Sequence, residues 1–120
     1  MPTTENNIDA ILDAISQDIK KQEMASQEAM EVLETLNTSN EDYKKANQKF
    51  GTSVYVAGYL GHILEDIKRD KDIMNAKLLI DYHSYIQRDK ANRADGPDDI
   101  SAGQKEVASI LKGYFNRFFN

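Results

Sequence analysis

Apolar residues recur in the first third of the chain at alternating spacings of four and three residues, the pattern that holds one face of an α-helix against a partner helix. The row of positions, which we call the seam, comprises Ile8, Leu12, Ile15, Ile19, Gln22, Ser26, Ala29, Leu33 and Leu36. Thr and Asn side chains near residue 4 can accept bonds from the free N–H groups of a first turn. We therefore predict a long, coiled-coil-like amphipathic helix over residues 4–37.

Two members of the seam are polar. Gln22 and Ser26 occupy positions where Leu or Ile is expected. A polar layer of this kind can set the register or the oligomeric state of a coiled coil at a cost in stability. The alternative is that the helix curves away from its core at this point.

The segment 39–94 carries further helical patterns. Ser39 and Asp42 resemble a capping arrangement at a helix start. Residues 51–56 resemble a strand locally, because β-branched and aromatic residues follow Gly51. A lone strand would leave its backbone groups unpaired, so we predict helix here, with a kink or break at Gly51.

A charged run at residues 68–72 leaves open whether residues 53–94 form one helix or two, since Asp70 or Asp72 could cap a second helix starting near Ile73. The segment after this run has apolar residues on most of its circumference, which predicts the central helix of a bundle. Before the run, small residues at helical spacing predict close packing against another helix backbone. These small residues are Ala57, Gly58 and Gly61.

Asp, Gly and Pro at residues 95–100 predict a turn. Ser101 and Gln104 then form a capping box for a C-terminal helix over residues 101–120, which ends in aromatic residues. The predicted fold is all-α: one domain over residues 1–120, a helical bundle of four to five helices with a long N-terminal helix.

The amino-acid composition limits the classes of protein and the kinds of chemical site that this chain can represent. Hydrophobic residues make up 40% of the 120-residue chain and charged residues 29%, as in a soluble globular domain, and no signal peptide or membrane span is readable. The absence of Cys excludes disulfides, thiolate metal sites and thiol nucleophiles. Residues 1–38 carry eight acids and two bases within a chain of net charge −5, so the acidity belongs to the N-terminal third.

Candidate chemical sites are sparse. His62 and Glu65 are three residues apart, but the order and the missing second carboxylate helix do not fit a di-iron bundle. Residues 88–93 are basic but interrupted by Asp89, which suits a helix C-terminus better than a nucleic-acid surface. We predict no enzyme, no metal, no cofactor, no membrane binding and no nucleic-acid partner.

The leading hypothesis is a non-enzymatic helical interaction or assembly module. It would form a homo-oligomer or dock on a larger complex, with a virion, a secretion apparatus or an inhibited host protein as candidate settings. The predicted interface lies on the first and last helices and comprises Ile8, Leu12, Ile15, Ile19, Gln22, Ser26, Leu33, Tyr114, Phe115, Phe118 and Phe119.

The alternative is a protein that binds a small, nucleotide-like ligand. Tyrosines and histidines on neighbouring helices could line its pocket with hydroxyl and imidazole groups. The candidate pocket residues are Tyr55, Tyr59, His62, Tyr82, His83 and Tyr85.

Overall fold

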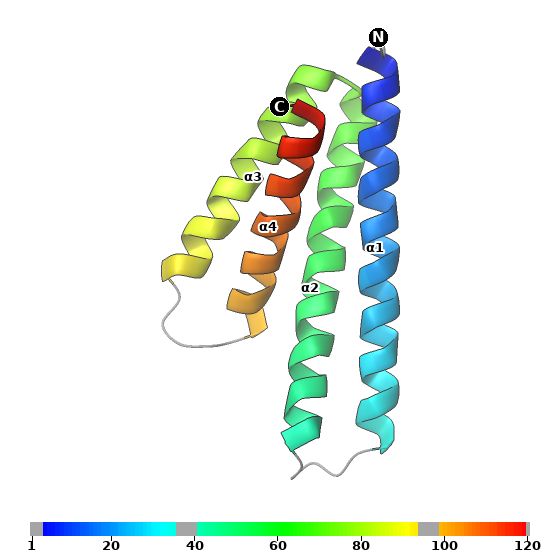
Figure 1. The fold of residues 1–120 in the computed structure, drawn as a ribbon, viewed down its shortest axis with the longest axis vertical. Coiled ribbons are helices and arrows are strands. Elements are labelled where there is room, and N and C mark those ends of the chain that lie inside the picture. Colours follow the sequence, from blue (N-terminus) through cyan, green and yellow to red (C-terminus); the bar gives the residue numbers. More distant parts are fainter. Residues whose placement is uncertain (1–3, 36–40, 94–98, 120) are drawn as a thin grey trace.

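Four α-helices make up the computed structural model, which describes residues 4–35, 41–93 and 99–119. They are α1 (Thr4–Thr35), α2 (Glu41–Asp70), α3 (Ile73–Arg93) and α4 (Asp99–Phe119), and the described ranges contain no strand. Helices α1 and α2 form a long antiparallel hairpin, and α3 and α4 form a shorter one beside it (Figure 1). The all-α prediction is confirmed, with four helices.

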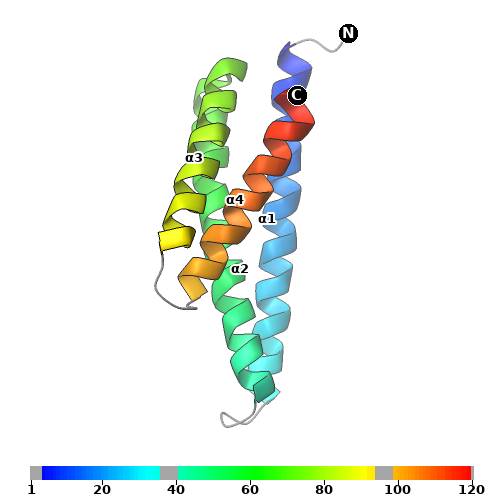
Figure 2. The ribbon, with the colours of Figure 1, turned by 60° about the vertical axis from the view of Figure 1, so that its left-hand side comes forward.

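The hydrophobic core receives side chains from all four helices. Helix α4 packs against α2 as well as α3. Figure 2 shows α4 running obliquely over the α1–α2 hairpin, with its C-terminal end beside α1. The largest fully buried apolar side chains are Ile11, Ile15, Val56, Leu60, Ile63, Ile67, Ile80, Val107 and Leu111. The predicted seam of the first helix reaches this core through Ile8 and Ile15, but the fully buried Ile11 lies outside the seam.

Helices α1 and α2 are longer than α3 and α4, with 32 and 30 residues against 21 and 21. The lower end of the α1–α2 hairpin consequently extends beyond the shorter hairpin (Figure 1). The polar seam residues Gln22 and Ser26 are half-buried. The Ser26 hydroxyl donates to the Glu23 carbonyl of its own helix at 2.7 Å, so it makes no bond across the seam.

Helix α2 runs through Gly51 without the predicted break, because residues on both sides of this glycine remain helical. The real interruption lies at residues 71–72. Lys71 has a φ of 45° and its N–H donates to the Ile67 carbonyl at 2.8 Å, which closes α2. The Asp72 carboxylate then accepts from the Met74 and Asn75 N–H groups at 2.8 and 3.1 Å, so it caps α3. Residues 53–93 are therefore two helices, and the predicted Asp72 cap is confirmed.

The prediction of close backbone packing at Ala57, Gly58 and Gly61 is wrong for both glycines. A Cβ atom added at Gly58 or Gly61 would meet nothing within 4 Å. Close approach occurs instead at Gly103 of α4, where a Cβ would lie 2.6 Å from the Cδ1 atom of Tyr55. The sequence offers no local signal for this contact, because its partner lies on another helix.

Helix α3 lies at the edge of the bundle rather than at its centre. Its buried residues, Ala76, Ile80, Gln87 and Ala91, share one face. The prediction that this helix is the central one is therefore wrong, and α4 packs against α2 more extensively than α3 does. The apolar residues around α3 led to a wrong prediction of its position in the bundle, because only one face of this helix reaches the core.

Several predicted boundaries fall on residues outside the described ranges. These are the end of the first helix at residues 36–37, the Ser39 cap and residues 95–98 of the predicted turn. Asp99 and Ile100, placed in that turn, belong to α4.

Candidate functional site

Most of the predicted interface is occupied within the chain itself. Ile8, Ile15 and Tyr114 are at most 5% exposed in the core, so the prediction that they contact a partner is wrong. The remaining apolar members of the upper seam and the C-terminal aromatics are partly buried against the core, namely Leu12, Ile19, Phe115, Phe118 and Phe119. Gln22, Ser26 and Leu33 are half-buried on the longer hairpin. The structure thus supplies a partner inside the chain for the surfaces that the sequence assigned to assembly.

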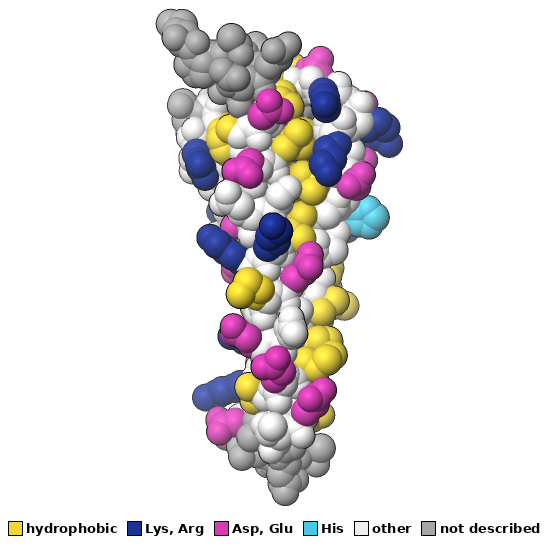
Figure 3. Space-filling view, turned by 90° about the vertical axis from the view of Figure 1, so that its right-hand side faces the viewer, with side chains coloured by type: hydrophobic (Ala, Val, Ile, Leu, Met, Phe, Trp, Pro, Cys, Tyr) yellow, Lys and Arg dark blue, Asp and Glu magenta, His cyan; other side chains and the backbone are white. Residues whose placement is uncertain are grey.

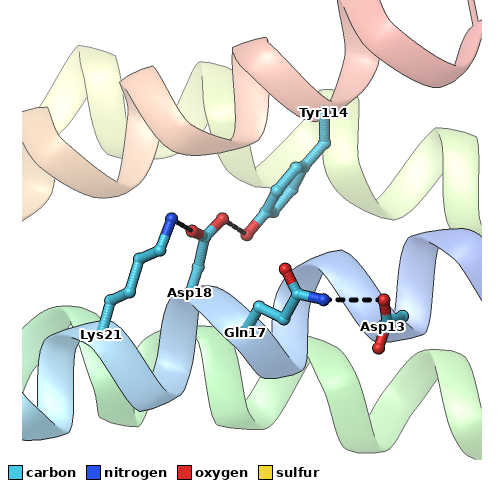
Figure 4. Close-up of polar contacts among 5 residues, drawn as sticks. All are labelled: Asp13, Gln17, Asp18, Lys21 and Tyr114. Carbon is cyan, nitrogen blue, oxygen red and sulfur yellow. Dashed lines mark hydrogen bonds and ion pairs between the residues drawn. The ribbon is translucent and has the colours of Figure 1, made fainter.

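Tyr114 links α4 to α1. Its hydroxyl donates a hydrogen bond to the Asp18 carboxylate, which also lies 3.9 Å from the Lys21 ammonium (Figure 4). Gln17 bonds Asp13 at 2.9 Å one turn away. Burial, followed by the adjacent Asp18 carboxylate, raises the pKa of Tyr114 far above its ordinary value, so the hydroxyl stays protonated. This contact positions α4 and leaves no reactive group free.

The predicted tyrosine and histidine pocket divides into two parts. Tyr55, Tyr59 and His83 form a hydrogen-bonded cluster between α2 and α3 that also includes Gln87. The Tyr55 hydroxyl donates to the Gln87 side-chain oxygen at 2.7 Å, and the Tyr59 hydroxyl lies 2.6 Å from Nδ1 of His83. Burial raises the pKa of both tyrosines and lowers the pKa of His83. The cluster fastens α3 to α2.

The other members of the predicted pocket face solvent. His62 is exposed on α2. Tyr82 and Tyr85 lie on the outer side of α3, and the Tyr82 ring meets the edge of His83 at a centroid distance of 5.4 Å. Tyr82 and Tyr85 line a groove together with residues that the sequence analysis did not identify.

That groove lies between the C-terminal end of α2 and the outer side of α3, and it has a volume of about 790 Å³. We call it the α2–α3 groove. Its lining residues are Asp66, Arg69, Asp70, Asn75, Leu78, Leu79, Asp81, Tyr82 and Tyr85. Sequence analysis identified Tyr82 and Tyr85 but not the carboxylates, because residues 66–70 and 81 approach each other only when α2 and α3 pack.

An apolar row runs along α3, and three of its four members, Leu78, Tyr82 and Tyr85, line this groove. Met74, Leu78, Tyr82 and Tyr85 recur at spacings of four, four and three residues, so they share one helix face. They are 59–69% exposed, among the highest values of any large hydrophobic residue in the described part of the chain. Because Ala76, Ile80 and Gln87 point to the core, this row, the α3 row, lies on the side of α3 away from it.

The groove is acidic. Arg69 lies 3.2 Å from the Asp66 carboxylate and 3.7 Å from the Asp70 carboxylate, so its charge is already engaged by these two residues. Asp81 makes no ion pair with a described residue. Three carboxylates and one guanidinium give the lining a net charge of −2.

The face of the molecule on the α1 side is different. Figure 3 shows hydrophobic side chains there in a narrow line along the long axis, with acidic and basic side chains on both sides and a smaller hydrophobic group towards the lower end. A narrow line between charged flanks is typical of the visible edge of a packed helix interface.

Among the described residues, no group of three His, Asp or Glu side chains could hold a metal ion. None of the four helices, over the residues described, is long and apolar enough to cross a membrane.

The fold defines an all-α helical bundle as the class of this protein. Comparison of the chain with protein-family models, curated proteins and solved structures finds no match in any of the three.

Proposed function

We propose that this chain is a non-enzymatic interaction module that binds a partner protein by seating a basic amphipathic helix in the α2–α3 groove. The observation that carries the proposal is the α3 row. Monomeric proteins rarely leave large apolar side chains grouped on one face, and such groups mark interaction surfaces. Four large side chains in line on the outside of a bundle have no role in its own core.

The length of the row suits a helix. Met74 and Tyr85 are eleven residues apart, which corresponds to roughly 16 Å along α3. An amphipathic helix lying in a groove presents anchors at i, i+3 or i+4 and i+7, which span roughly 10 Å and therefore fit within the length of the row. Tyrosine is also among the residues enriched at the centres of protein interfaces.

The net negative charge of the α2–α3 groove favours a positively charged partner. Asp66, Asp70 and Asp81 outnumber Arg69, so Lys or Arg beside the apolar face of an incoming helix would find complementary carboxylates. An acidic helix would meet repulsion. We therefore assign the groove to a basic helix rather than to another acidic segment such as α1.

The test uses an 18-residue Leu/Lys amphipathic peptide with one Trp and a Leu/Glu peptide of the same pattern. The chain contains no Trp, so peptide emission reports binding directly. We expect the Leu/Lys peptide to bind at least tenfold more tightly than the Leu/Glu peptide in dilute salt.

The matched variants are Leu78→Asp and Met24→Asp, because both side chains are 62% exposed but Met24 lies on α1. Leu78→Asp should weaken binding of the Leu/Lys peptide at least tenfold, since burial of a leucine contributes about 1.5–3 kcal/mol. Met24→Asp should leave it unchanged. Equal affinities for the two variants would contradict the proposal.

Sedimentation equilibrium distinguishes a second copy of the chain as the occupant. A wild-type dimer at micromolar concentration that becomes monomeric in Leu78→Asp would assign the same face to self-association. A dimer that persists in Leu78→Asp would place association elsewhere on the molecule.

A small ligand is the second candidate for the same groove, because 790 Å³ lies within the size range of small-molecule sites and the groove contains the exposed Tyr82 and Tyr85. The three carboxylates disfavour a phosphate-bearing nucleotide there. Displacement of the peptide by a nucleoside, but not by its triphosphate, would support this candidate.

A further inference from the structure

A second groove lies on the other hairpin, between α3 and α4, and has a volume of about 460 Å³. We call it the α3–α4 groove. Its lining residues are Arg88, Asn92, Lys105, Ala108, Ser109, Lys112, Gly113 and Asn116. It shares no lining residue with the α2–α3 groove.

The charge of this groove is opposite to that of the rest of the molecule. Arg88, Lys105 and Lys112 give its lining three positive charges, and no carboxylate belongs to the described residues that line it. The whole chain has a net charge of −5. Positive charge is therefore concentrated here against the average of the protein.

None of the three cations in the groove makes an ion pair with a described carboxylate, which is also true of most cations elsewhere in the described residues. Arg69 and Arg93 each pair with aspartates of their own helix, Arg93 with Asp89 at 3.1 Å. Arg88 and Lys105 make no ion pair with any described carboxylate. Lys112 lies 5.8 Å from the centroid of the Phe115 ring, a contact that leaves its charge uncompensated.

Hydrogen-bond donors follow the groove on both walls. On α4, Lys105, Ser109, Lys112 and Asn116 recur at spacings of four, three and four residues, so they form one row of about 16 Å. Arg88 and Asn92 stand on the α3 wall. Gly113 also lines the groove, and a Cβ added to it would meet nothing within 4 Å.

We propose that the α3–α4 groove binds a ligand that carries several phosphate groups in series. Guanidinium and ammonium groups are the usual partners of phosphate oxygens, and hydroxyl and amide groups add further donors. Lys105 and Lys112 are separated by roughly 10 Å along the helix axis, so phosphates in series engage both of them better than a single phosphate does. This site is independent of the α2–α3 groove and of the partner helix.

Calorimetric titration with tripolyphosphate in dilute salt tests the site. The double variant Arg88→Gln, Lys112→Gln should weaken binding at least tenfold and flatten its dependence on salt. The control, Lys44→Gln with Lys45→Gln, removes the same charge from exposed positions on α2 and should change affinity less than twofold. An equal loss in both variants, or no heat of binding at millimolar tripolyphosphate, would overturn the proposal.

Two further probes identify the source of the phosphates. Hexathymidylate that binds more tightly than tripolyphosphate, and loses affinity in the groove variant, would assign the groove to a nucleic-acid backbone. Tripolyphosphate that binds more tightly than hexathymidylate would assign it to a free oligophosphate. Orthophosphate that binds as tightly as tripolyphosphate would contradict a series of phosphates.

Discussion

A methyl group at position 103 would collide with Tyr55, whereas the same group at position 58 would enter open space. The added Cβ would lie 2.6 and 3.0 Å from the Cδ1 and Cγ atoms of the tyrosine ring at position 103, and beyond 4 Å from any neighbour at position 58. Gly103→Ala should therefore lower the free energy of unfolding by about 1–3 kcal/mol. Gly58→Ala should raise it by about 0.5–1 kcal/mol, because alanine favours the helix. Chemical denaturation measures the change in the free energy of unfolding of each variant. A stabilised Gly103→Ala would contradict the packing of Gly103 against Tyr55.

His83 should make stability depend on pH. Burial holds its pKa below the ordinary value of 6.5, with Lys90 acting in the same direction and Asp66 opposing. As pH falls below about 6.5, the unfolded chain takes up the proton first, so the free energy of unfolding decreases. Protonation also places a hydrogen on Nδ1, the atom that faces the Tyr59 hydroxyl.

Denaturation between pH 8 and pH 5.5 measures this effect. His83→Gln should reduce the loss of stability across that interval. His62→Gln, at an exposed position of the same helix pair, should not alter it. Identical pH profiles for the wild type and His83→Gln would exclude the role given to His83.

At the level of helices, local signals were predictable from the sequence and long-range placement was not. The spacing of Ile8 and Ile15 predicted a core-facing side of α1, because helical periodicity is a property of neighbouring residues, but the predicted seam did not include the fully buried Ile11. The cap at Asp72 was equally local. The outer position of α3 was not predictable, since apolar residues on all sides of a helix do not indicate which face meets the core.

The same limit applies to the candidate site. Tyr82 and Tyr85 were identified as site residues from their type and spacing, but Asp66 and Asp70 join them only through the packing of α2 on α3. The sequence does not distinguish tyrosines that bond to a neighbouring helix from tyrosines that face solvent. Tyr55 and Tyr59 were therefore predicted to line the same pocket as Tyr82 and Tyr85. Their bonds to Gln87 and His83 depend on the register between the two helices.

The cap of α3 supports a prediction at this scale. Asp72→Ala removes the acceptor for the Met74 and Asn75 N–H groups and should lower the free energy of unfolding by about 1 kcal/mol. Asp72→Asn retains a side-chain acceptor and should cost less than half as much. Thermal unfolding of the two variants compares them, and equal losses would show that charge rather than capping stabilises this position.

For the whole molecule, the C-terminal aromatics belong to the bundle rather than to a separate interface. Phe118 and Phe119 are half-buried and pack against the core, and Arg117 lies 4.9 Å from the centroid of the Phe118 ring. Deletion of residues 118–120 should therefore lower the unfolding midpoint by several degrees, since each kcal/mol corresponds to about 3–6 °C for a chain of this size. The mass in solution and the affinity for the Leu/Lys peptide should be retained. An unchanged unfolding midpoint in the truncated chain would show that these residues do not contribute to the core.

The central claim is that the groove between α2 and α3 is the docking surface of the molecule. Amide chemical-shift mapping of the isotope-labelled chain, titrated with the Leu/Lys peptide, tests it most directly. We predict that the largest shifts fall within residues 66–70 and 74–85, while the lower half of the α1–α2 hairpin is unaffected. Shifts concentrated on α1, or spread evenly over all four helices, would contradict the claim.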